Sequence, residues 1–190
     1  MNTYDFHDRL AFSTSRNGRP LGQVIAETIP GVVRVVATDV AQDKTGVDYI
    51  AHLRRGAQVF IDLKMRDRGC GQFWDGEEDL ALEIWSVIPE DGFPGKRGWT
   101  LDEAKATHYT LHAFDPSDSA RVFILPFQLL RKAFRAHFED WGVRYRHAIQ
   151  DSGRWRSECL FVPVSVVLTA INEAMIVPAK NPVDTLQASM

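Results

Sequence analysis

The sequence predicts an α/β protein with a mixed central β-sheet flanked by helices. Strand-like segments recur between residues 32 and 125, and helical patterns lie before and after them. Turns rich in glycine and proline separate these segments. With 190 residues, of which 45% are hydrophobic, the chain is long enough to bury a substantial core.

The first half of the chain is expected to hold one core helix and most of the strands. Leu21, Val24 and Ile25 follow helical spacing until Pro30 ends the pattern. β-branched residues and alternating apolar side chains predict the strands that follow. In chain order we expect a short helix at 5–13, the core helix at 21–29, strands at 32–38, 47–53 and 57–66, and a strand or short helix at 80–88.

The second half is expected to hold one hairpin and two helices. Residues 89–98 contain two prolines and three glycines, which predicts a loop. Leu130, Phe134 and Phe138 at helical spacing predict the longest helix. In order we expect a helical turn at 101–105, strands at 107–114 and 121–125, a helix at 127–145, a strand at 159–163 and a helix at 164–175.

Charge and cysteine content exclude several classes of protein. The chain has 22 basic and 25 acidic residues, so it lacks the overall positive charge that would indicate a nucleic-acid partner. Two cysteines and an N-terminus without the pattern of a signal peptide predict a cytoplasmic protein. No apolar run approaches the roughly 20 residues that span a bilayer, so no membrane partner is expected.

Three charged residues share one face of the strand expected at 57–66. Because strand residues alternate between faces, Asp62, Lys64 and Arg66 point to the same side. The residues between them are apolar. We therefore expect the apolar face to pack on the core and the charged face to look outward.

The register of the expected hairpin brings two acids together. A three-residue turn at 54–56, with Gly56 at positive φ, would pair Asp48 with Asp62. The Cβ atoms of directly opposed residues lie roughly 4.5–5.5 Å apart. Two carboxylates at this separation repel each other, and a divalent cation is the usual remedy. Lys64 would point at the same pocket.

A helix-borne acid, a strand with Asp and a strand with acid-x-Lys together resemble the PD-(D/E)XK nuclease superfamily, which has the restriction-endonuclease-like fold. The residues that carry the resemblance are Glu27, Asp48 and Asp62-Leu63-Lys64. Their order and spacing are similar to the Holliday junction resolvase branch. The match covers roughly residues 19–66. Many members carry Glu in the acid-x-Lys pair, and this chain has no proline before Asp48.

The resemblance implies a Mg²⁺-dependent nuclease that hydrolyses phosphodiester bonds in DNA as an endonuclease, with Mn²⁺ as a substitute. It implies that Asp48 and Asp62 hold the metal, with the backbone carbonyl of Leu63 as a further ligand. Lys64 would position or deprotonate the attacking water. Glu27 would bind a second metal or orient the first.

Basic residues elsewhere are candidates for contacts with the DNA backbone. Trp141, Tyr145 and Trp155 are interleaved with arginines, which predicts either a surface that stacks on bases or a helix end with core aromatics. The candidate DNA-binding residues are Arg66, Lys96, Arg97, Arg144, Arg146, Arg154 and Arg156.

Simpler interpretations of individual residues stay open. Opposite charges at i and i+2 are common on solvated strands, and Glu27 also fits a solvent-facing helix position. His108 and His112 fit cross-strand packing better than a metal site. Gln72 and Glu83 are weaker site candidates.

For the whole chain, we expect one nuclease-like domain over residues 1–178 and a flexible tail at 179–190. The alternative function is a catalytically silent or partner-dependent member of the same fold that binds nucleic acid or protein. Cutting of both DNA strands by a one-site domain would favour a homodimer.

Overall fold

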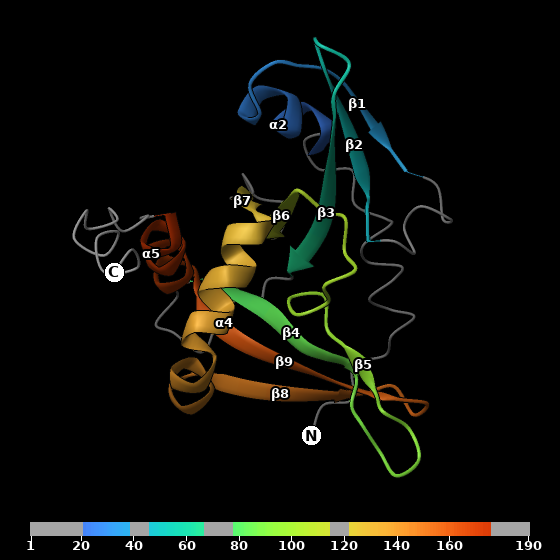
Figure 1. The fold of residues 1–190 in the computed structure, drawn as a ribbon, viewed down its shortest axis with the longest axis vertical. Coiled ribbons are helices and arrows are strands. Elements are labelled where there is room, and N and C mark those ends of the chain that lie inside the picture. Colours follow the sequence, from blue (N-terminus) through green and yellow to red (C-terminus); the bar gives the residue numbers. More distant parts are fainter. Residues whose placement is uncertain (1–20, 39–45, 67–77, 115–121, 176–190) are drawn as a thin grey trace, which may run out of the picture.

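The computed structural model describes residues 21–38, 46–66, 78–114 and 122–175 (Figure 1). Within these ranges it is a mixed α/β structure with two β-sheets and three helices. In chain order the elements are α2 (Leu21–Thr28), β1 (Val32–Ala37), β2 (Tyr49–Leu53), β3 (Gln58–Arg66), β4 (Asp79–Val87), β5 (Lys96–Arg97), β6 (Tyr109–Phe114), β7 (Val122–Pro126), α4 (Phe127–Arg144), β8 (Arg146–Asp151), β9 (Arg156–Pro163) and α5 (Val164–Met175).

The first sheet is the mixed sheet that the sequence predicted. Its five strands have the order β1-β2-β3-β6-β7, in which β3 and β6 are parallel and the other neighbours antiparallel. The second sheet, with the order β5-β4-β9-β8, is wholly antiparallel. The prediction of one central sheet did not include this second sheet.

The β2–β3 hairpin has the predicted register. Tyr49 pairs with Ile61, and Ala51 pairs with Val59. At the turn, the Leu53 amide donates to the Ala57 carbonyl at 2.9 Å, and Gly56 has φ +82°. Glycine adopts this backbone region without the steric cost that a Cβ brings, so the local sequence sets the register.

Two hydrophobic clusters lie on the two sheets. α2 covers β1 and β2 (Figure 1). Its Ile25 is completely buried in one cluster with Ala51 and Ile61. The larger cluster joins α4 and α5 to the second sheet and to β6 and β7. Each large side chain that becomes fully buried, such as Phe134, contributes about 1.5–3 kcal/mol.

The region after α4 differs from the prediction. The helix ends at Arg144, one residue earlier than expected, and residues 146–151 form the strand β8. The strand expected at 159–163 begins at Arg156 instead. β8 is an edge strand whose backbone pairs with β9 alone, so its conformation depends on a partner that the local pattern does not reveal.

Two further expectations concern segments that the structure describes. Residues 79–87 form a strand rather than a short helix, and residues 101–105 form turns rather than a helical turn. The short helix expected at 5–13, the connection between the strands expected at 107–114 and 121–125, Gln72 and the tail expected at 179–190 lie outside the described residues. None of the described helices is long and apolar enough to cross a membrane.

Candidate functional site

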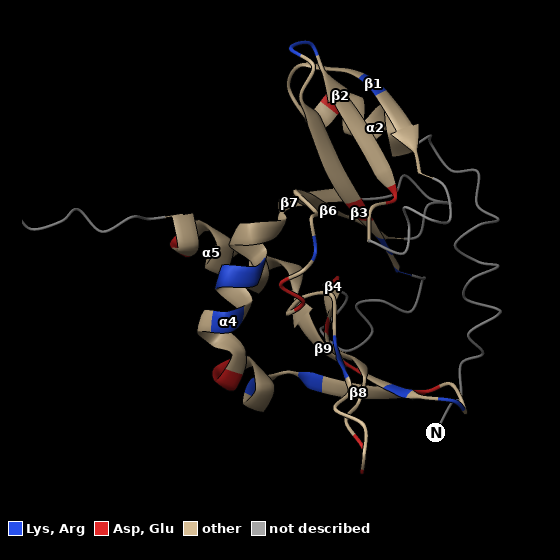
Figure 2. Cartoon of the chain, turned by 45° about the vertical axis from the view of Figure 1, so that its right-hand side comes forward, with Lys and Arg blue, Asp and Glu red and all other residues tan. Residues whose placement is uncertain are grey.

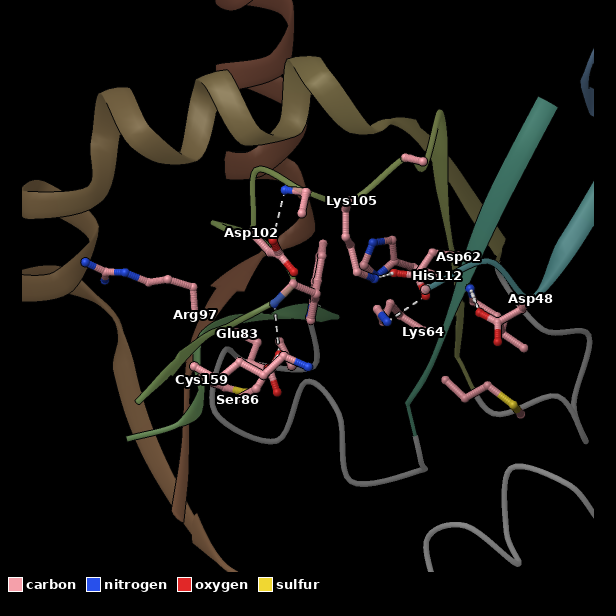
Figure 3. Close-up of a pocket in the computed structure, with 18 of the residues that line it drawn as sticks. Asp48, Asp62, Lys64, Glu83, Ser86, Arg97, Asp102, Lys105, His112 and Cys159 are labelled. Carbon is pink, nitrogen blue, oxygen red and sulfur yellow. Dashed lines mark hydrogen bonds and ion pairs between the residues drawn. The ribbon is translucent and has the colours of Figure 1, made fainter. Parts of the chain in front are cut away.

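A pocket of about 800 Å³ lies where the two sheets meet (Figure 3). The first sheet supplies β3 and β6, and the second supplies β4, β5 and β9. The segment between β5 and β6 closes one side. The polar residues that matter most for the chemistry are Asp48, Asp62, Lys64, Glu83, Lys105 and His112.

Asp48 immediately precedes β2, and its backbone extends the pairing of β2 with β3 by one hydrogen bond. Its amide donates to the Ile61 carbonyl at 2.9 Å, and its Oδ2 accepts a hydrogen bond from the Leu63 amide at 2.5 Å. Burial and the neighbouring Asp62 charge raise the pKa of Asp48 from 3.8 to about 7, although the Leu63 amide favours the ionised form. The contact with the Leu63 amide directs the Asp48 carboxylate toward β3, and Asp48 and Asp62 line the same pocket.

Asp62 on β3 is only 2% exposed, so the expectation that the charged face looks outward is wrong for this residue. The second sheet and the segment before β6 cover this face, which alternation within one strand cannot reveal. Burial alone would raise the pKa of Asp62. The ammonium groups of Lys64 and Lys105 outweigh that effect and hold the pKa below its ordinary value.

Lys64 lies on the same face of β3, as the sequence predicted. Its Nζ is 2.8 Å from Asp62 Oδ1 and 5.2 Å from the centre of the Trp99 ring. Its side chain is 27% exposed, so the ammonium remains accessible from the pocket. Asp48, Asp62 and Lys64 thus lie together at one wall of the pocket.

Lys105 is the functional candidate that sequence reasoning missed. Its Nζ is 2.5 Å from Asp62 Oδ2, although the two residues are 43 positions apart. Burial, followed by the charge of Lys64, lowers the pKa of Lys105. The sequence predicted only a helical turn at 101–105 and no site residue within it, so no local signal links Lys105 to the acids.

Glu83 on β4 lines the opposite part of the pocket and holds the chain next to β5. Its Oε2 accepts hydrogen bonds from Ser86 Oγ at 2.7 Å and from the Trp99 amide at 2.9 Å. A Cβ at Gly98 would lie 2.2 Å from the Glu83 carbonyl oxygen. Glu83 therefore acts on the site through the position of Trp99.

The two histidines make separate local contacts. His108 Nδ1 accepts a hydrogen bond from the Phe60 amide at 3.0 Å, and the two rings are 5.2 Å apart. His112 is buried with Nε2 3.1 Å from Thr110 Oγ1. Burial lowers the pKa of His112 to about 3, so its ring is neutral at pH 7.

Glu27 is not brought to the pocket. It is exposed on α2, where its carboxylate accepts a hydrogen bond from Gln23 at 2.8 Å, and it is absent from the pocket lining. This position fits the solvent-facing interpretation of the residue. The order of motifs along the chain is therefore matched only in part by the arrangement in space.

The candidate DNA-binding residues fall into three groups. Lys96 and Arg97 line the pocket, and the Arg97 guanidinium lies 4.0 Å from the centre of the Trp85 ring. Arg66 also lines the pocket, but its guanidinium forms a buried ion pair with Asp79. The four arginines outside the lining are Arg144, Arg146, Arg154 and Arg156.

These four outer arginines lie at the end of α4 and on the β8–β9 hairpin (Figure 2). Arg144 pairs with Asp140, and Arg156 pairs with Glu90. The stacking interpretation is wrong for Trp141, which is 2% exposed within the larger hydrophobic cluster. Trp155 is 41% exposed.

The carboxylates of Asp48 and Asp62 are the oxygen donors on this wall of the pocket. Among the described residues, no group of three or more His, Cys, Asp or Glu side chains is placed to hold a metal. Mg²⁺ is commonly bound through one or two carboxylates together with water and substrate phosphate. Burial raises the pKa of Asp48 most, and the charge of Asp62 adds to that rise.

Comparison of this chain with known protein families, curated proteins and solved structures gives no match. The functional argument therefore rests on the pocket and its residues.

Proposed function

We propose that the pocket is the active site of a Mg²⁺-dependent nuclease that hydrolyses phosphodiester bonds in DNA, as an endonuclease of the PD-(D/E)XK type. The observation that carries the proposal is the meeting of Asp48, Asp62 and Lys64 in one pocket, where Asp48 immediately precedes β2 and the other two residues lie on β3. The five-stranded mixed sheet is compatible with a restriction-endonuclease-like core.

Each residue has a role that follows from its surroundings. Asp48 and Asp62 would hold Mg²⁺ or Mn²⁺, with the Leu63 carbonyl as the further ligand that the resemblance implies. When bound, the metal would activate a water molecule and offset charge on the phosphate. Lys64, held by Asp62 at 2.8 Å, is suited to orient the water and to stabilise developing negative charge.

The DNA would approach along the basic side of the pocket. Lys96 and Arg97 on β5 line that side and are exposed. They can pair with backbone phosphates without reading sequence. One such site cuts one strand, so cutting of both strands would require a second copy of the chain, in keeping with a homodimer.

A second candidate function is favoured by one observation. Both oxygens of Asp62 already accept hydrogen bonds from lysines, so the acid is charge-compensated without a metal. A catalytically silent or partner-dependent member of the fold, acting as a module that binds nucleic acid or protein, would have the same arrangement. Stabilisation by metal separates the two functions, because an intact metal site raises the melting temperature when Mn²⁺ binds.

The test is incubation of the purified protein with supercoiled plasmid and with branched DNA, in Mg²⁺, Mn²⁺ or EDTA. Nicking or cutting in either metal and none in EDTA is the expected result. A folded protein that cleaves equally well in EDTA would contradict the proposed role of the metal. A protein that cleaves neither DNA in either metal would favour the binding module.

A further inference from the structure

Two lysines surround one buried carboxylate in the pocket. Lys64 Nζ contacts Asp62 Oδ1 at 2.8 Å, and Lys105 Nζ contacts Asp62 Oδ2 at 2.5 Å. Together with Asp48, these residues form a cluster of two acids and two bases that we call the site quartet. The formal charges of the quartet cancel, so the acid pair is balanced by side chains of the chain itself.

Lys105 is held in this position by its surroundings. Gly46 has φ +76°, and a Cβ added there would lie 2.4 Å from Lys105 Nζ. Because residue 46 is a glycine, it leaves room for the Lys105 ammonium next to its backbone. Thr107 Oγ1 donates to the Gly46 carbonyl at 2.9 Å and joins the two segments. The contact with Asp62 is thus built by the packing of two separate loops.

The two lysines differ in how they reach Asp62. Lys64 is two residues away on the same strand and is 27% exposed, with its ammonium also over the Trp99 ring. Lys105 comes from the segment before β6 and is only 12% exposed. The contact of Lys105 with Asp62 therefore depends on the packing of a separate segment, while Lys64 is carried by the same strand as the acid.

A divalent cation at Asp62 needs a carboxylate oxygen that now accepts a hydrogen bond from an ammonium. A positive charge next to a metal ligand also repels the metal. We propose that Lys105 is the internal counter-cation of the acid pair, a positioning residue that competes with a divalent metal for Asp62 and thereby sets the metal affinity of the site. The proposal rests on the proposed function only in taking Asp48 and Asp62 as the metal-binding acids.

The test is titration of the metal-free protein with Mn²⁺ in a calorimeter, without DNA. Lys105→Met should bind Mn²⁺ about tenfold more tightly than wild type, the size expected when a like charge within a few ångströms is removed. Lys96→Met is the matched control, because Lys96 lines the same pocket. It should change the affinity less than about threefold, since exposed charges are screened.

Melting curves give a second readout that does not require binding by the wild type. In EDTA, Lys105→Met should melt at a lower temperature than wild type, because Asp62 loses one of its two partners and stays buried. Mn²⁺ should then raise the melting temperature of Lys105→Met by more than that of wild type. These curves also verify that each variant is folded.

Equal Mn²⁺ affinity in wild type and Lys105→Met would overturn the proposal. An equal gain in Mn²⁺ affinity in Lys96→Met and Lys105→Met would overturn it too, because the gain would then come from the lower positive charge of the pocket as a whole. The failure of the proposed function looks different. If Lys105→Met binds Mn²⁺ more tightly but wild type does not cleave DNA, the role of Lys105 as counter-cation is supported and the proposed nuclease activity is contradicted. If wild type cleaves DNA with metal but Lys105→Met has unchanged Mn²⁺ affinity, the nuclease activity is supported and the role of Lys105 is contradicted.

Discussion

Asp48 and Asp62 are chemically identical, yet their surroundings shift their pKa values in opposite directions. Asp48 is partly buried beside another carboxylate, and its pKa rises to about 7. Asp62 is more deeply buried, but two ammonium groups keep its pKa below the ordinary value. Partners therefore outweigh burial at Asp62, whereas burial dominates at Asp48.

The raised pKa of Asp48 predicts how stability depends on pH without metal. Between pH 3.8 and about 7 the folded protein keeps a proton on Asp48 that the unfolded chain has lost. This contribution is fully present below pH 3.8 and is lost as the pH rises through about 7. Wild type should therefore lose stability relative to Asp48→Asn across this window.

Urea unfolding in EDTA at several pH values measures this difference. Asp48→Asn removes the titrating group and nearly keeps its shape, so its own curve serves as the reference. A difference in free energy of unfolding that stays constant from pH 4 to pH 8 would contradict the raised pKa.

The residues of the candidate site could be predicted from the sequence only where the signal was local. Asp48, Asp62 and Lys64 follow from strand alternation and one hairpin turn. Lys105 reaches Asp62 from the segment before β6, 43 residues away, and no local pattern encodes that contact. Glu27 entered through the family resemblance, and the structure leaves it on the exposed face of α2.

At the scale of elements, β3 and β4 are joined by a buried ion pair. Arg66 at the end of β3 pairs with Asp79 at the start of β4, and the Asp79 side chain is 0% exposed. The guanidinium lies 4.7 Å from the centre of the Phe161 ring on β9. The pair thus connects the first sheet to the second next to the pocket.

Breaking this ion pair on one side should be costly. Asp79→Leu leaves the Arg66 guanidinium buried without its carboxylate and should lower the free energy of unfolding by about 3–5 kcal/mol. The double variant Arg66→Met with Asp79→Leu removes both charges and should recover most of that loss. Denaturant unfolding measures both, and a double variant as unstable as Asp79→Leu would argue against a charge effect.

The contact between Gly98 and β4 gives a second prediction for an element. In Gly98→Ala the new Cβ would lie 2.2 Å from the Glu83 carbonyl oxygen, so the chain next to β5 must move. The expected loss is about 1–3 kcal/mol, the usual cost of overpacking. Gly22→Ala in α2 is the control, because the new Cβ would make an ordinary contact with Val35 of β1 at 3.6 Å. It should stabilise by about 0.5–1 kcal/mol, and equal losses in the two variants would contradict the account.

Elements whose determinants are local were predicted well, and those that depend on distant partners were not. The helix at residues 164–175 and the β2–β3 hairpin match because periodicity and Gly56 act over a few residues. β8 was missed because its alternating, largely exposed residues become a strand only through pairing with β9.

At the scale of the whole molecule, the pocket exists because two sheets meet. β3 carries Asp62 and Lys64, while β4 and the chain next to β5 supply Glu83 and Trp99. The mixed α/β class was predicted from the order of elements. The second sheet was not, because β4 pairs with β9 across more than 70 residues, as Leu80 with Val162 shows.

The measurement that tests the central claim most directly is the rate of Mn²⁺-dependent DNA cleavage by Lys64→Ala beside wild type. The control is Lys132→Ala, an exposed lysine of α4 whose ammonium donates to the Ala174 carbonyl. If Lys64 stabilises the reacting phosphate, its removal should slow cleavage by about 100-fold or more, and the control should stay within about twofold of wild type. Cleavage by folded Lys64→Ala at the wild-type rate would contradict the proposed active site.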